Sequence, residues 1–173
     1  MNNRVSAKQV NSLLQAAECN MEQGEIRIAG TDWILMNGAT FRKLIQGSEK
    51  ILGSGAAPVW FEAGKHAGRE FSGNLVRLGM PFHEVPQAFE EFFTKGGWGN
   101  VLAKVDFAKK EALVTVKNSV IARGIEATAP VCYSIRGFIK GVCDVIFQGE
   151  TECIETRCMA TGDAYCEFRA KRT

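Results

Sequence analysis

The alternation of apolar and polar residues divides the chain into helical and strand-like segments. Apolar residues recur at helical spacing over five stretches, which are predicted helices: residues 6–23, 39–52, 57–80, 83–95 and 130–147. Alternation with a period of two predicts antiparallel pairs of strands over residues 25–37, 100–119 and 151–169. Because helices and strands are grouped rather than strictly alternating, we expect an α+β fold, an antiparallel sheet with helices packed on one face.

Two of the predicted helices carry further information. The helix over residues 57–80 has an apolar face made of Val59, Ala63, Ala67, Phe71 and Leu75. Two small residues, Gly64 and Gly68, lie beside this face. Small residues four apart allow close approach of a second helix or of a ligand, and tight helix packing is the commoner cause. The helix over residues 130–147 is almost entirely apolar and is expected to be buried on several sides.

The length of 173 residues suits one domain with a substantial core. We expect an N-terminal helix within residues 1–24, packed on a partner or on its own sheet, followed by a single domain over residues 25–173. A net charge of +2 without clustered basic residues argues against direct nucleic-acid binding. No apolar run is long enough to span a membrane, and the N-terminus shows no signal segment, which predicts a cytoplasmic protein.

The candidate chemistry lies in the last part of the chain. Cys158 and Cys166 flank Gly162-Asp163, a turn signal that places the two cysteines opposite each other in a hairpin. Glu155 lies just upstream, and Cys132 begins the apolar helix. Three thiolates and one carboxylate suit a tetrahedral zinc site.

The spacing leaves alternatives open. Residues three apart on a regular strand point to opposite faces, so Glu155 can join Cys158 only through a bulge or irregular turn at Thr156-Arg157. Without Glu155, a water molecule would complete the metal shell. The cysteines could instead be buried free thiols, or form disulfides that pair Cys158 with Cys166 and Cys143 with Cys153, although a reducing cytosol disfavours disulfides.

Three segments together resemble the 4-vinyl reductase (hydrocarbon-binding) domain family: Pro130-Val131-Cys132, Glu155-Thr156-Arg157-Cys158 and Gly162-Asp163-Ala164-Tyr165-Cys166. The family includes the aromatic-sensing domains of phenol-responsive transcription activators. The resemblance implies zinc held by Cys132, Glu155, Cys158 and Cys166. It also implies a homodimer with the ligand-binding fold shared by nitric-oxide-signalling and Golgi-transport proteins. Residues 25–173 would then form a zinc-containing small-molecule-binding domain.

In the resemblance, a hydrophobic molecule lies between the helices and the sheet, near the zinc. The candidate ligand-binding residues are Trp60, Phe71, Phe89, Phe93, Trp98, Val116, Tyr133 and Phe138. The His and Trp that hold the phenol hydroxyl in the sensors fall near Phe93 and Val116, and neither side chain can donate a hydrogen bond. His83 is a possible substitute, though such a residue is more often at the surface. A more apolar or larger ligand than phenol is therefore expected.

Binding is favoured over catalysis. The chain lacks the nucleophile elbow, the zinc-protease motif, the P-loop and the dinucleotide fingerprint. We therefore expect a zinc-stabilised domain that binds or senses a hydrophobic small molecule and acts through a separate signalling or enzyme partner. Two alternatives are a tetrapyrrole-handling protein related to vinyl-group reduction and an assembly protein like the vesicle-tethering relatives.

Overall fold

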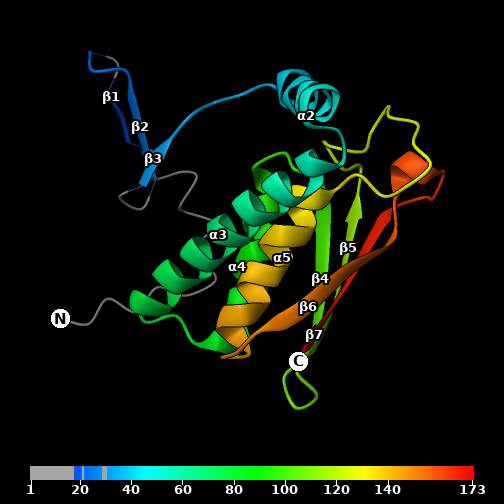
Figure 1. Ribbon diagram of the computed structural model, residues 1–173. Helices are drawn as coiled ribbons and strands as arrows, with labels where there is room; N and C mark the ends of the chain where they lie inside the picture. Colours follow the sequence, from blue (N-terminus) through cyan, green and yellow to red (C-terminus); the bar gives the residue numbers. More distant parts are fainter. Residues whose placement is uncertain (1–17, 21, 29–30) are drawn as a thin grey trace.

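The computed structural model describes residues 18–20, 22–28 and 31–173, and its N-terminal part is a small antiparallel sheet (Figure 1). The strands lie in the order β1-β2-β3 and are β1 (Glu18–Asn20), β2 (Glu25–Ile28) and β3 (Thr31–Trp33). The β2–β3 pair confirms the first predicted hairpin. The helix predicted over residues 6–23 is wrong at residues 18–20, which pair with β2, and its earlier part lies outside the described residues.

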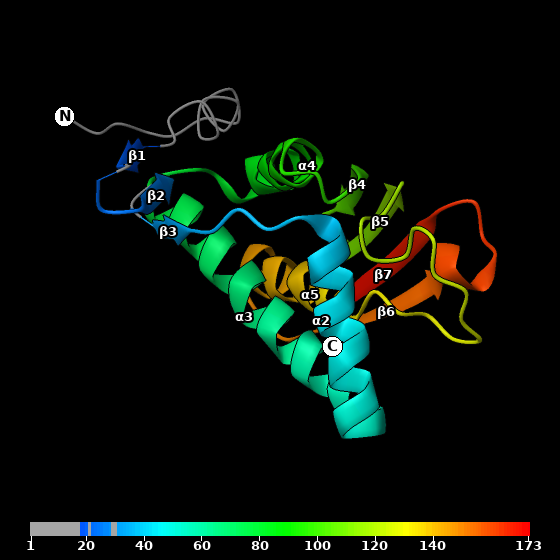
Figure 2. The same ribbon diagram turned by 90° about the horizontal axis from the view of Figure 1, so that it is seen from above.

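The main body is a second antiparallel sheet with helices on one face (Figures 1 and 2). Its strands follow the order β4-β5-β7-β6, with β4 at Asn100–Asp106, β5 at Glu111–Lys117, β6 at Thr151–Arg157 and β7 at Cys166–Arg172. Alternate residues of β5, beginning at Ala112, are buried beneath the helices. The predicted α+β fold class is therefore confirmed.

Four α-helices of the described chain belong to this body: α2 (Gly38–Leu52), α3 (Ala56–Arg77), α4 (Val85–Lys95) and α5 (Tyr133–Ile146). Short 3-10 turns precede α3 and α4 and follow β6, at Gly53–Gly55, Phe82–Glu84 and Met159–Thr161. No helix within the described ranges is long and apolar enough to cross a membrane.

Helices α3 and α5 pack through glycines on both partners. A Cβ atom at Gly64 would lie 2.1 Å from the Ser134 carbonyl oxygen, and one at Gly137 would lie 2.0 Å from the Phe61 carbonyl oxygen. Gly68 and Gly141 show the same backbone-to-backbone approach one turn further along. Close helix packing is therefore the role of these glycines, and no larger residue fits this seam.

The apolar face predicted for residues 57–80 is partly wrong. Val59 is 56% exposed, and Ala63 and Ala67 are exposed as well. The buried side of α3 is instead the glycine side, which continues to Leu75. Contact with α5 selects the smallest side chains, and hydrophobicity alone does not indicate them.

Helix α4 covers the free edge of β4. Two backbone N–H groups of the strand, from Val101 and Ala103, donate to the Thr94 hydroxyl at 3.1 Å and to the Glu90 carboxylate at 2.5 Å. Unpaired edge groups otherwise offer a template for another chain. These two side chains occupy the edge and fix α4 against the sheet.

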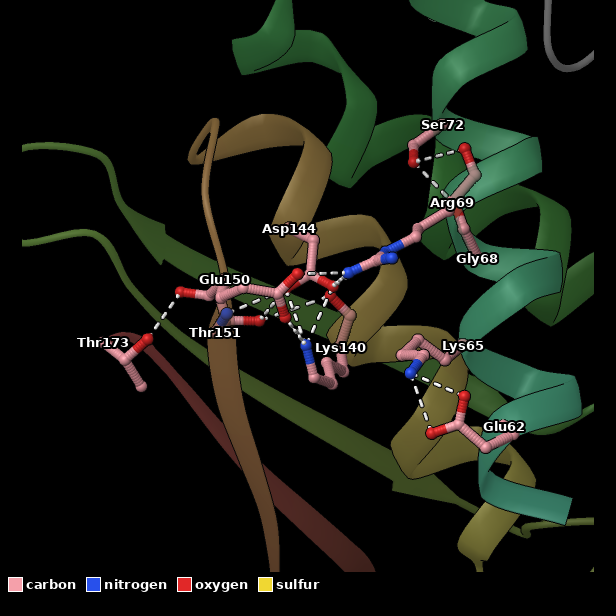
Figure 3. A network of polar contacts seen from close by, with 10 residues as sticks. All are labelled: Glu62, Lys65, Gly68, Arg69, Ser72, Lys140, Asp144, Glu150, Thr151 and Thr173. Carbon is pink, nitrogen blue, oxygen red and sulfur yellow. Dashed lines mark hydrogen bonds and ion pairs between the residues drawn. The ribbon is translucent and has the colours of Figure 1, made fainter. Parts of the chain in front are cut away.

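A buried carboxylate joins α3 and α5 to β6, the edge strand at the opposite end of the sheet from β4 (Figure 3). The Asp144 side chain accepts hydrogen bonds from Arg69 Nη2 at 2.7 Å, Lys140 Nζ at 2.9 Å and Thr151 N at 2.8 Å. Burial opposes ionisation of Asp144, but the bonds from Lys140, Thr151 and Arg69 outweigh it and lower its pKa. Glu150, whose side chain is 70% exposed, pairs with the same two cations from outside.

Candidate metal centre and aromatic cluster

Four potential metal ligands converge where α5 begins. Cys132 occupies the N-cap position of α5, Glu155 lies in β6, Cys158 follows β6, and Cys166 begins β7. One ligand atom from each residue lies within 4.8 Å of those of the other three. The three cysteines are fully buried, and Glu155 is half-buried. These four side chains, called the metal cluster below, could hold a single ion.

The irregularity expected in β6 is present. Glu155 pairs with Phe168 of β7, whereas Arg157 pairs with the adjacent Glu167, so Thr156 is an extra residue in the strand. The Thr156 hydroxyl donates to the Glu167 carboxylate at 2.8 Å. The bulge turns Glu155 and Cys158 towards the same face, as the predicted ligand set requires.

The loop between Cys158 and Cys166 is longer than a two-residue hairpin turn. Its hydrogen bonds return to Cys158, whose backbone N–H donates to the Asp163 carboxylate at 2.9 Å and whose carbonyl accepts the Thr161 N–H at 3.1 Å. Gly162 adopts φ 97°, a left-handed conformation that suits glycine. These contacts hold Cys158 beside Cys166 at the end of the paired strands.

The sulfur positions fit coordination better than a disulfide. The Sγ atoms of Cys132 and Cys166 are 3.7 Å apart. A disulfide requires about 2.05 Å, whereas a tetrahedron with metal–sulfur bonds of about 2.3 Å has sulfur–sulfur edges of about 3.8 Å. All six cysteines lie in the described part of the chain, and none of them forms a disulfide.

The carboxylate of Glu155 has one free oxygen. Its Oε2 accepts the Cys132 N–H at 3.1 Å, while Oε1 is buried and has no hydrogen-bond partner in the described chain. Burial raises the pKa of Glu155 to about 8. Hydrogen bonds from Cys132 and Cys166 lower the pKa of Cys158, and the bond to Cys158 in turn raises that of Cys132. Buried acidic groups that share protons in this way provide donors for a cation, which would displace those protons.

A continuous aromatic cluster is built mainly from α2, α3, α4 and α5. It consists of Trp33, Phe41, Trp60, Phe71, Phe89, Phe92, Phe93, Trp98 and Phe138. Phe93 is central, since its ring centroid lies 4.6 Å from that of Phe138, 4.7 Å from that of Phe89 and 5.4 Å from that of Trp98.

The structure brings most of the predicted ligand-binding residues into this cluster: Trp60, Phe71, Phe89, Phe93, Trp98 and Phe138. Val116 is fully buried on the helix-facing side of β5. Tyr133 contacts Arg136 instead, at 5.8 Å from guanidinium carbon to ring centroid, and His83 is exposed. Trp33, Phe41 and Phe92 were not predicted, although Phe92 follows Phe89 at helical spacing.

The rings leave little room in the conformation described. A void of about 10 Å³ lies between α4, α5 and the sheet, lined in part by Phe89 and Ile139. A groove of about 580 Å³ lies elsewhere, along the face of the sheet that the helices do not cover, and includes Lys104, Leu113, Ile154 and Arg169. A molecule that enters this void beside Phe89 must therefore displace side chains.

Comparison with known proteins finds a family match in the C-terminal part of the chain. Residues 113–172, a segment that contains the whole metal cluster, match the V4R domain. The resemblance to the 4-vinyl reductase family is thereby confirmed.

Two archaeal relatives match parts of the chain. An uncharacterized protein of Methanocaldococcus jannaschii, MJ0855, is 34% identical over 84 residues, which are 47% of this chain and 35% of that protein. A second, MJ0150, is 24% identical over 120 residues, or 69% of this chain and 66% of that protein. The chain thus spans about a third and just under two thirds of these relatives.

Solved structures share the fold at low sequence identity. The phenol-responsive sensory domain of the transcription activator PoxR aligns with TM-score 0.80 and 20% identity, covering 95% of this chain and 89% of that one. Subunit 3 of a trafficking protein particle complex from Naegleria fowleri aligns with TM-score 0.59 and 15% identity over 79% and 92%. An H-NOX protein from S. oneidensis aligns with TM-score 0.55 and 12% identity over 96% and 89%. These neighbours confirm the predicted fold class.

Proposed function

We propose that the chain is a small-molecule-sensing domain in which the aromatic cluster receives an apolar ligand and the metal cluster holds zinc. The observation that carries the proposal is the convergence of three buried cysteines and a half-buried glutamate, one of whose oxygens has no hydrogen-bond partner in the described chain, in a domain that also holds a continuous cluster of aromatic rings. Two structural neighbours were solved with an organic molecule, phenol in PoxR and palmitic acid in the trafficking subunit, which supports a fold suited to such ligands.

Zinc would be held by Cys132, Glu155, Cys158 and Cys166. With the four residues as ligands, a bound ion would link the start of α5 to the β6–β7 hairpin, and four protein ligands would leave no open coordination position for a substrate. Glu155 is oriented by the Cys132 N–H, which leaves Oε1 for the metal. These features support structural stabilisation rather than catalysis.

The ligand class follows from the chemistry of the cluster. Phe93 and Val116 cannot donate hydrogen bonds, and the Trp60 Nε1 already donates to the Ser48 hydroxyl at 2.7 Å. A ligand among these rings gains dispersion and apolar burial but few polar contacts. An aromatic or extended hydrocarbon without a required hydroxyl fits this environment better than phenol.

The remaining parts of the proposal concern partners and location. The domain would act in the cytoplasm, where the thiols stay reduced, and pass its signal to a separate protein. A homodimer is expected from the resemblance. Ile51 and Leu52 of α2, 83% and 51% exposed, supply apolar surface that supports an intermolecular contact.

Native mass spectrometry of the reduced protein tests the proposal directly. We expect one zinc ion per chain and a co-purified hydrocarbon-like molecule, with the zinc lost in Cys158→Ser and retained in Cys19→Ser, whose thiol is exposed. Protein without stoichiometric zinc would overturn the metal assignment. A bound tetrapyrrole in place of a hydrocarbon would favour the pigment-handling alternative.

A further inference from the structure

A short buried segment lies between the metal cluster and the aromatic cluster. It follows β5 and comprises residues 119–122, of which Ser119 and Ile121 are 0% exposed and Ala122 is 1% exposed. The Ser119 Oγ is 3.8 Å from the Cys132 Sγ, within hydrogen-bond reach of sulfur. A buried serine placed beside a candidate metal ligand requires an explanation.

The direction of the Ser119 hydrogen bond follows from its second partner. The Ala122 N–H donates to the Ser119 Oγ at 3.4 Å, so the hydroxyl oxygen already acts as an acceptor. The hydroxyl carries a single hydrogen, and the Cys132 sulfur is its other polar neighbour. Ser119 therefore donates to Cys132 whenever Cys132 is a thiolate, the form in which it would bind a metal.

The next residue connects to the aromatic cluster. The Val120 N–H donates to the Trp98 carbonyl at 2.9 Å, and the Val120 carbonyl accepts from Arg42 Nη1 of α2 at 2.7 Å. The Trp98 ring lies 5.4 Å from Phe93 and 5.4 Å from Phe41, measured between ring centroids. One peptide unit thus separates the contact to Cys132 from the contacts to Trp98 and α2.

We propose that Ser119 is a positioning residue for the metal, and that the segment 119–122 couples the metal cluster to Trp98. The proposal rests on the proposed function, because it requires a metal at Cys132. Hydrogen bonds to ligands from outside the coordination sphere fix ligand orientation, and their loss typically weakens metal affinity about 10–100-fold. A ligand that displaces Trp98 would shift Val120 through its hydrogen bond to the Trp98 carbonyl, and would thereby shift Ser119 and its contact with Cys132.

Metal affinity provides the first test. Zn²⁺ dissociation constants are measured by competition with a chromophoric chelator for the wild type, Ser119→Ala and Ser134→Ala. Ser134 is the control, since its buried hydroxyl has no hydrogen-bond partner in the described part of the chain, although it lies only two residues after Cys132. We expect Ser119→Ala to weaken binding about tenfold and Ser134→Ala to leave it near the wild-type value. Equal affinities for the two variants would overturn the proposal.

The fluorescence of Trp98 provides the second test. With Trp33→Phe and Trp60→Phe, Trp98 is the only tryptophan, and its emission is recorded as Zn²⁺ is added to saturation. We expect a change in emission that Ser119→Ala reduces even at saturating Zn²⁺ and that Ser134→Ala preserves. An undiminished change in Ser119→Ala would refute the coupling while leaving the zinc site intact. If the wild type binds no Zn²⁺, the proposed function itself fails.

Discussion

The glycine seam between α3 and α5 predicts opposite effects for one substitution at two positions of the same helix. At Gly68, an added Cβ would meet the Phe138 carbonyl oxygen at 2.1 Å, whereas at Gly73 no atom of the described residues lies within 4 Å. Both positions are helical, so alanine gains about 1 kcal/mol of helix propensity over glycine at each. The two variants therefore differ mainly in packing.

The magnitude for Gly68→Ala follows from that contact. Backbone atoms cannot rotate away, so the helices must separate by roughly 1 Å to restore an ordinary contact, which disturbs packing along the whole seam. Overpacking of this kind costs typically about 1–3 kcal/mol, and more where the neighbour is rigid. Because the neighbour at Gly68 is backbone, we take the upper part of this range, about 2–3 kcal/mol. After the propensity gain of about 1 kcal/mol, we expect a net loss of about 1–2 kcal/mol for Gly68→Ala and a gain of about 0.5–1 kcal/mol for Gly73→Ala.

Urea unfolding of the metal-loaded protein measures both values through the unfolding midpoint at constant slope. For a chain of this size, 1 kcal/mol corresponds to about 2–4 °C in Tm, so the two variants should lie on opposite sides of the wild type. If Gly68→Ala proved as stable as Gly73→Ala, α3 and α5 would not approach at Gly68 as described. The reasoning about the seam would then be refuted.

Two further predictions concern the polar and metal sites. Replacement of Asp144 by Asn should destabilise the fold by about 2–3 kcal/mol, less than for a fully buried pair because the Arg69 side chain is 37% exposed. Glu150→Gln should change stability far less, because the Glu150 side chain is 70% exposed. Because the pKa of Asp144 is lowered, its contribution is present above about pH 4 and fades as the pH falls further, so the Asp144→Asn deficit should shrink in urea titrations at low pH. Cys166→Ser should lower Tm and zinc content together, and a chelator should remove the difference in Tm from the wild type; a Tm difference that persists after chelation would contradict a metal origin.

Local periodicity and residue chemistry account for what could be predicted. The helices α2 to α5 and the strands β4 to β7 were predicted because each carries its own apolar pattern and its own breaking residues. The metal cluster was predicted because cysteine and glutamate are chemically distinctive, and the bulge at Thr156 followed from the requirement that Glu155 face Cys158.

Features that depend on the relative placement of two elements could not be predicted. β1 exists through pairing with β2, while its own residues continue a helical pattern. The buried side of α3 is set by α5, and the corresponding signal was a second pair of glycines, Gly137 and Gly141, at the same spacing. The network around Asp144 depends on the rotation of both helices, which no local pattern specifies.

The structure also indicates which elements can move when a ligand enters. Helix α5 is tied to β6 at both ends, by Glu155 and the Cys132 N–H at one and by Asp144 and Thr151 at the other, and to α3 by the glycine seam between them. Helices α2 and α4 form the opposite side of the aromatic cluster. Among the hydrogen bonds described for α2, one reaches the segment that follows β5, from Arg42 to the Val120 carbonyl. On the proposed function, ligand entry should therefore displace α2 before α5. Amide hydrogen exchange rates should then change with ligand in α2 and hardly at all in α5, and the reverse pattern would place the binding site elsewhere.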